Sequence, residues 1–213
     1  MKASGLDQET LLKFKVTTSA GVHALPLAEF AALGILNGFK RSAELAQDQA
    51  AKVWPELRTP TRLVSGSTLV VTGLGEIGLE TARIARALGM TVSGTKRNLE
   101  PIEGIEQVAG NNGLPGLLAT ADAVVNTLPG TPYTETLFNR EMFAAMKPGT
   151  VFVNVGRGTV VDEDALLEAL DSGQVSYACL DAFAVEPLPT AGPLRYHPRV
   201  LSSPQHWAPA PRR

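Results

Sequence analysis

The stretch VVTGLGEIGLETARIARALGM, residues 70–90, decides the fold, because three glycines separate an apolar run from a run of helix formers. Residues 67–72 (STLVVT) predict a buried strand. Residues 76–89 place apolar side chains at roughly helical spacing, and Gly89 ends the predicted helix. The order is therefore strand, glycine turn and helix.

The three glycines, Gly73, Gly75 and Gly78, follow the spacing G-x-G-x-x-G. A side chain at Gly75 would hold a ligand away from the backbone. A helix that begins near Glu76 points free N–H groups and the positive end of its dipole at whatever lies above the turn. The pattern predicts a dinucleotide-binding turn, although the same spacing alone also fits a tight structural turn.

The rest of the chain continues to alternate between strands and helices. Asp162 is the predicted N-cap of one helix and Gly173 its terminator, and residues 26–52 predict one long helix. Another helix is predicted over 139–149, with Lys147 in its last turn. Strands are expected within 90–95, 121–129, 150–156, 175–183 and 199–203. This order predicts an α/β fold with a doubly wound parallel sheet of the Rossmann type.

Composition narrows the function classes. The 213 residues carry a net charge of −2, which gives a nucleic-acid partner no electrostatic support. No apolar run approaches the roughly 20 residues of a membrane helix, and residues 1–10 lack the apolar core of a signal peptide. A single cysteine, Cys179, forms no internal disulfide, and no Cys/His spacing predicts a metal site. We therefore expect a cytoplasmic protein.

Ligands of such folds bind beyond the carboxyl ends of the strands, so the residues that follow each strand matter most. Those residues include Arg157, Asp181, Glu186 and His206. An arginine pairs with a substrate carboxylate, and a histidine held by a carboxylate exchanges a hydroxyl proton. These are the groups that a carbonyl–alcohol oxidoreductase needs.

Several longer motifs make a resemblance specific. VFVNVGRGTVVDEDALLEAL (151–170) followed by CLDAFAVEPLP (179–189) resembles the signature of the D-isomer-specific 2-hydroxyacid dehydrogenases. The stretches at 20–29, 73–78 and 128–149 resemble that family in the same order. The resemblance implies NAD or NADP as cofactor, hydride transfer to or from a small 2-hydroxy or 2-oxo acid, and a homodimer that uses the helix within 26–52.

The resemblance also implies roles for individual residues. Arg157 corresponds to the catalytic arginine that binds substrate, Glu186 to the partner of the catalytic histidine, and Asp181 to a contact of the nicotinamide carboxamide. The remaining implied cofactor residues are Gly73, Gly75, Glu76, Ile77, Gly78, Thr95, Leu128, Pro129, Thr134, Val155 and Gly156. From the residues alone, Arg157 also fits an exposed turn cation, Asp181 a local cap and Glu186 a surface carboxylate.

The histidine departs from the family pattern. The family places it directly after Ser/Thr-Pro, where this chain has Gln205, and His206 follows one step later. Neighbouring side chains of an extended chain point to opposite sides. His206 is therefore either the acid/base of a shifted loop or a surface histidine.

The resemblance divides the chain into four parts. Residues 1–24 resemble a remnant of a flavodoxin-like substrate lobe, 25–60 a linking helix and connector, 61–208 the dinucleotide-binding domain and 209–213 a tail. Against the family pattern, most of the first lobe and the C-terminal helix are missing. The rival to an enzyme is therefore a cofactor-binding module or an inactive fragment.

The ribose end of the site favours NADP. NAD-selective sites have an acidic residue about 20 positions after the first glycine. Here that region reads SGTKRN, and Lys96 and Arg97 are suited to a 2′-phosphate. The alternative is a solvated basic turn.

Overall fold

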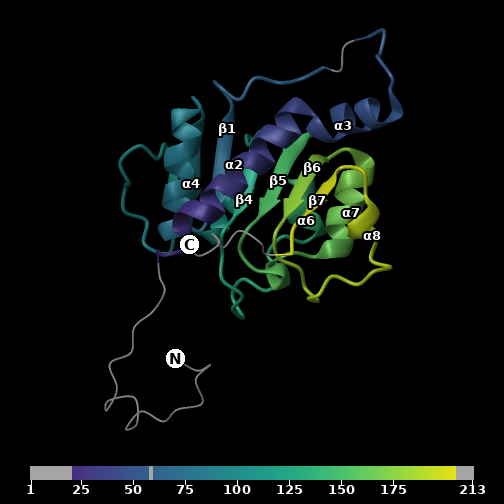
Figure 1. The fold of residues 1–213 in the computed structure, drawn as a ribbon. Helices are drawn as coiled ribbons and strands as arrows, with labels where there is room; N and C mark the ends of the chain where they lie inside the picture. The colour runs from purple at the N-terminus through teal and green to yellow at the C-terminus, as the bar shows by residue number, and fades with distance from the viewer. Residues whose placement is uncertain (1–20, 58–59, 205–213) are drawn as a thin grey trace, which may run out of the picture.

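A single sheet of seven parallel strands organises the computed structural model, which describes residues 21–57 and 60–204 (Figure 1). The strands are β1 Thr68–Thr72, β2 Thr91–Thr95, β3 Val108–Ala109, β4 Ala123–Asn126, β5 Thr150–Asn154, β6 Val175–Leu180 and β7 Val200–Ser202. Their order across the sheet is β3-β2-β1-β4-β5-β6-β7. The predicted doubly wound parallel sheet is confirmed.

Helices cover both faces of the sheet (Figure 1). α2 (Ala24–Lys40) and α4 (Glu76–Ala87) pack on one face, and α5 (Leu114–Leu118), α6 (Arg140–Ala144) and α7 (Glu163–Ser172) on the other. The remaining short elements are α3 Ser42–Ala51, α8 Pro193–Tyr196 and the 3₁₀ turns η2 Asn111–Gly113 and η3 Gly158–Val160. None of the helices in the described ranges is long and apolar enough to cross a membrane.

Strand alternation builds two separate cores. Val70 of β1 faces the α5–α7 side, whereas its neighbours Leu69 and Val71 face α2 and α4. Phe152 of β5 lies on the first side and stacks edge-on against Phe138 and Phe143. Because both sides of each strand are buried, the central strands read as continuous apolar runs in the sequence.

The predicted ends of α7 are confirmed. The Asp162 carboxylate accepts a hydrogen bond from the Ala165 amide, and Gly173 ends the helix at a φ of 80°. The helix predicted over 139–149 is shorter than expected, because α6 ends at Ala144. Lys147 therefore lies outside any helix, and its ammonium pairs instead with Asp122.

The prediction of one long helix over 26–52 was wrong, because the structure has two helices there, α2 and α3. Arg41 adopts a left-handed conformation with a φ of 52°, and α2 ends before it. The Phe39 carbonyl in the last turn accepts a hydrogen bond from the Arg62 amide. The Ser42 hydroxyl donates to the Asn37 side-chain oxygen, which holds the corner between α2 and α3.

A charged cluster lies at the amino edge of the sheet. The Asp122 carboxylate accepts hydrogen bonds from Lys147 and from the Thr68 amide. Burial alone would raise the pKa of Asp122, but these hydrogen bonds and the charges of Lys147 and Arg62 outweigh it and hold the pKa below its usual value.

This lowered pKa predicts a pH-dependent contribution to stability. A carboxylate whose pKa is lower in the folded state stabilises the fold above its unfolded pKa, and this contribution is lost as the pH falls through the folded value. We expect Asp122→Asn to lower the free energy of unfolding by about 1 kcal/mol at pH 7. Urea unfolding of both proteins should show the difference shrinking below about pH 4. A difference that stays constant with pH would contradict this assignment.

Candidate functional site

The strand order reverses between β1 and β4, and the loops that follow these strands open a cleft of about 920 Å³. Open α/β sheets bind ligands at such a switch point. The cleft is lined by four segments that follow strands and by the start of α2. The residues from the strand ends are Gly73, Gly75, Glu76, Ile77, Thr127, Leu128, Pro129, Val155, Gly156, Arg157, Gly158, Thr159, Asp181, Ala182, Phe183, Ala184 and Glu186.

Two glycines of the turn after β1 are explained by the fold. Gly73 has a φ of 95°, which favours glycine. A Cβ on Gly78 would lie 2.1 Å from the Gly73 carbonyl oxygen, so only glycine lets α4 pack this closely on the turn.

Gly75 is different. Its φ of −93° and ψ of −161° suit any residue. An ideal Cβ there meets no heavy atom of the described residues within 4 Å, its chain neighbours aside, and it lies on the wall of the cleft. Neither backbone conformation nor packing requires glycine at this position.

The start of α4 also faces the cleft. Gly75 is its N-cap, Glu76 and Ile77 line the cleft, and the first turn of a helix leaves its N–H groups without helical partners. An open wall at Gly75 beside the positive end of a 12-residue helix fits a diphosphate group.

Arg157 lies between two glycines that bring three loops together. A Cβ on Gly156 would lie 2.6 Å from the Leu128 carbonyl oxygen, and one on Gly158 would lie 1.8 Å from the Phe183 carbonyl carbon. The Arg157 side chain is exposed on the cleft wall, and its Nη1 donates to the Gly156 carbonyl. The close packing of the loops thus presents the guanidinium to the cleft.

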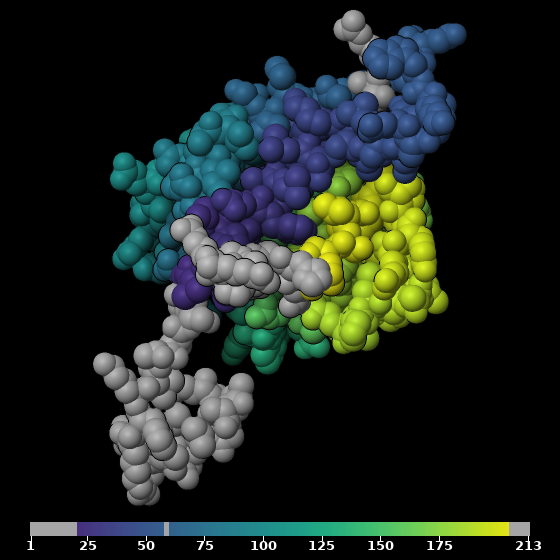
Figure 2. All heavy atoms as spheres, in the orientation of Figure 1, coloured from purple at the N-terminus to yellow at the C-terminus, as the bar shows by residue number. Residues whose placement is uncertain are grey.

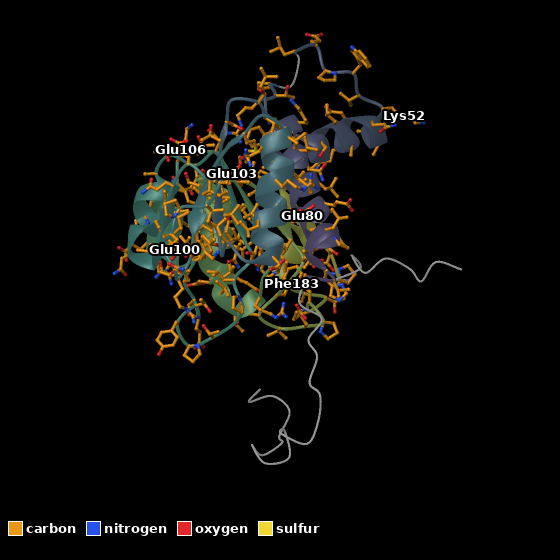
Figure 3. All side chains as sticks on the ribbon, turned by 90° about the vertical axis from the view of Figure 1, so that its left-hand side faces the viewer. Lys52, Glu80, Glu100, Glu103, Glu106 and Phe183 are labelled. Atoms are coloured by element: carbon orange, nitrogen blue, oxygen red, sulfur yellow. The ribbon has the colours of Figure 1, made fainter. Side chains whose placement is uncertain are left out.

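Two carboxylates stand on the neighbouring loop, which follows β6. Asp181 directly follows β6, is 2% exposed and lines the cleft. Glu186 is exposed at the rim, and its Oε1 accepts a hydrogen bond from the Phe183 amide at 3.0 Å. Both also line a second cavity of about 610 Å³, which Ser203 and Pro204 help to form. Figure 3 shows Phe183 of the same loop at the carboxyl edge of the sheet.

Five predicted cofactor residues lie outside the lining of this cleft: Gly78, Thr95, Lys96, Arg97 and Thr134. The buried Thr95 hydroxyl accepts a hydrogen bond from the Gly73 amide, so it holds the glycine turn. Thr134 donates to the Pro129 carbonyl and holds the loop after β4. Lys96, half-buried, and Arg97, exposed, follow β2 at the same edge of the sheet. Gln205 and His206 lie outside the described residues.

Sequence reasoning missed a chain of buried polar side chains beneath the cleft. Thr72, Asn126 and Asn154 end β1, β4 and β5, and each is at most 1% exposed. Their side chains are hydrogen-bonded to one another in that order. The sequence could have indicated this chain, because each of two apolar strands ends in an asparagine, and a polar side chain is costly to bury there without hydrogen-bond partners.

Cys179 supplies no chemistry to the cleft. It is fully buried on β6, and burial, helped by the charge of Asp181, raises the pKa of its thiol to about 12. Among the described residues, no group of three or more histidine, cysteine and acidic side chains is arranged to hold a metal ion.

Comparison with known proteins supplies a family match. Residues 32–208 match the family described as D-isomer specific 2-hydroxyacid dehydrogenase, NAD binding domain. A glyoxylate/hydroxypyruvate reductase A from Serratia proteamaculans is 34% identical over 181 residues, which are 85% of this chain and 57% of that protein.

Two solved structures resemble the chain closely. A D-isomer specific 2-hydroxyacid dehydrogenase from Xanthobacter autotrophicus Py2, in complex with NADPH and MES, is 35% identical with a TM-score of 0.82, over 90% of this chain and 60% of that one. An NADPH-dependent glyoxylate/hydroxypyruvate reductase from Sinorhizobium meliloti, in complex with NADP and sulfate, is 29% identical with a TM-score of 0.79, over 92% and 61%. The chain thus spans about 60% of the length of these relatives.

Proposed function

The chain belongs to the D-isomer specific 2-hydroxyacid dehydrogenase family, whose NAD-binding domain it matches, and we propose that it binds NAD(P) in the cleft above Gly73–Gly78. The activity we propose for the protein is hydride transfer between the nicotinamide of this cofactor and a small 2-hydroxy or 2-oxo acid. The observation that carries this proposal is Gly75, a glycine that the fold does not require and that leaves room for a diphosphate.

The cleft residues divide the remaining tasks. When bound, the cofactor supplies or accepts the hydride. Arg157 pairs with the substrate carboxylate and polarises the neighbouring carbonyl, because its guanidinium presents two parallel N–H donors. Asp181 accepts from the carboxamide of the nicotinamide ring. Val155 and Gly156 flank that ring, and Leu128 and Pro129 also line the cofactor cleft.

Proton transfer is the step that separates enzyme from binding module. In this proposal Glu186 holds the acid/base, but the family's histidine position holds Gln205 in this sequence. Glutamine exchanges no proton near neutral pH, and this substitution favours a cofactor-binding, non-catalytic module as the second candidate. Oxidation of NADPH and NADH in the presence of glyoxylate, hydroxypyruvate or pyruvate, measured beside a cofactor titration, separates the two functions.

Lys96 and Arg97 support a preference for NADP. Both follow β2 at the edge of the sheet that carries the glycine turn. Two solved relatives hold NADPH or NADP.

The preference predicts a selective loss of NADP affinity. Changing both residues to alanine removes two charge-assisted partners of the 2′-phosphate, each worth roughly 1.5–3 kcal/mol. The dissociation constant for NADPH should rise at least about tenfold. The constant for NADH, which lacks that phosphate, should stay within about twofold by the same fluorescence titration. Equal constants for the two cofactors in the parent, unchanged in the double variant, would contradict the assignment.

An exposed apolar surface supports a homodimer. α2 forms an open band across one face of the molecule, and α3 continues it (Figure 2). Its exposed side carries Leu33 and Leu36, and the following connector carries Trp54 and Leu57, which are 95% and 86% exposed. Exposed apolar side chains of this size favour an interface.

The molecular mass of the protein in solution tests the dimer prediction. Light scattering at micromolar concentration should give twice the mass of the chain. Leu33→Glu combined with Leu36→Glu should give the monomer mass, whereas Leu99→Glu, an exposed leucine on another loop, should not. A monomeric parent would contradict the prediction.

A further inference from the structure

The Asn154 side chain bonds two cleft loops and the end of strand β4. Its Oδ1 accepts from Asn126 Nδ2 at 2.8 Å and from the Gly156 amide at 3.1 Å. Its Nδ2 donates to the carbonyls of Ala182 and Arg157, at 3.2 and 3.4 Å. The loops after β5 and β6 therefore both bond this buried amide directly, and the loop after β4 is linked to it through Asn126, the last residue of β4.

The orientation of this amide is fixed by its neighbours. The Gly156 N–H only donates, so the atom that faces it is oxygen, and the Ala182 carbonyl only accepts, so the other atom is nitrogen. Asn126 is fixed in the same way, because its Oδ1 accepts from the Leu128 amide at 3.2 Å. The Thr72 hydroxyl donates to the same oxygen at 3.0 Å.

The backbone of Asn154 adds a further tie. Its carbonyl accepts from the Asp181 amide at 2.9 Å. Asn154 therefore contacts the backbone of Arg157 directly and the backbone on both sides of the Asp181–Ala182 peptide. The side chains of Arg157 and Asp181 both line the cleft, whereas Asn154 is 1% exposed and is absent from its lining.

We propose that Asn154 is a positioning residue that holds Arg157 and Asp181 in a fixed relation to each other in the cleft lining. The inference rests on the proposed function, in which Arg157 takes the substrate carboxylate and Asp181 the carboxamide of the cofactor. A shift of one loop against the other would separate these two contacts, and misplacements of about 1 Å are known to cost about a hundredfold in rate.

The test is Asn154→Asp, which keeps the shape and removes both N–H donors. A carboxylate oxygen would then face the Ala182 and Arg157 carbonyls. The matched control is Thr150→Val, which removes a buried hydroxyl that donates to the Ala121 carbonyl at the opposite end of the same strand. Both variants lose buried hydrogen bonds, but only the first touches the cleft loops.

The first readout is independent of any ligand. In ¹H–¹⁵N spectra, Asn154→Asp should shift the amide signals of 156–158, 181–183 and Leu128 together, whereas Thr150→Val should leave all three groups in place. Shifts confined to 156–158 would overturn the inference. If Asn154→Asp does not fold, Asn126→Asp, which removes the donor to Asn154 and keeps the acceptor for Leu128, is examined in the same way.

The second readout uses NADPH and oxamate, a non-reacting mimic of a 2-oxo acid. Asn154→Asp should raise the dissociation constant of oxamate for the NADPH-loaded protein by about tenfold or more, and Thr150→Val should not change it. Wild-type oxamate affinity in Asn154→Asp would overturn the inference. A parent that binds neither NADPH nor oxamate would refute the proposed function, while the joint amide shifts would still support the positioning role.

Discussion

Replacing Gly75 with valine is expected to raise the dissociation constants of NADPH and NADH by about a hundredfold or more, which corresponds to roughly 3 kcal/mol. The branched side chain would project into the cleft where the diphosphate meets the start of α4. Stability should fall by only about 1 kcal/mol, because the change exchanges one N-cap residue for a poorer one. Cofactor fluorescence titration and urea unfolding measure the two effects separately.

Gly78→Val is the matched control for this experiment. Its Cβ would lie 2.1 Å from a backbone oxygen, so this variant should lose the fold rather than only the ligand. A folded Gly75→Val protein that binds both cofactors as well as the parent does would show that the diphosphate lies elsewhere.

Turnover is expected to be slow or absent in the parent and to rise by about 10²- to 10⁴-fold in Gln205→His, the range typical of general acid–base catalysis. The variant restores a proton-exchanging ring at the family's position, two residues after Ser203, where Glu186 and Ser203 line one cavity. Steady-state oxidation of NADPH with small 2-oxo acids measures the change.

His206→Ala separates the two possible registers of the loop. It should leave the activity of the parent and of Gln205→His unchanged. Strong activity in the parent that His206→Ala abolishes would instead identify His206 as the acid/base of a shifted loop. If the parent, Gln205→His and His206→Ala all lack activity but still bind the cofactor, the non-catalytic cofactor-binding module is favoured over the enzyme.

The elements that local chemistry defines were predictable from the sequence. β1, the glycine turn and α4 follow from a buried strand, three spaced glycines and a helical period, and α7 follows from its Asp162 cap and Gly173 stop. The break at Arg41 was not predictable, because a tertiary hydrogen bond from the Arg62 amide to the Phe39 carbonyl accompanies the end of α2. The two-residue strand β3 is too short to give a pattern.

The candidate site divides in the same way. Arg157, Asp181 and Glu186 stand where strands end, and the structure brings all three to one cleft. The hydroxyls of Thr95 and Thr134 bond loop backbone, and the cofactor contacts predicted for both residues stay predictions. The role proposed for Asn154 depends on its contacts with Ala182 and with Asn126, which are both 28 residues away in sequence, so no local pattern reveals it.

Titration of the ¹⁵N-labelled chain with NADPH tests the central claim most directly. The account predicts saturable one-to-one binding, with the largest amide shifts at Gly75, Glu76 and Ile77 and smaller ones at Leu128, Gly156 and Asp181. The backbone of the glycine turn would meet the diphosphate, and the other loops would meet the nicotinamide half. Shifts that leave residues 73–78 unchanged, or no binding at millimolar NADPH, would contradict the account.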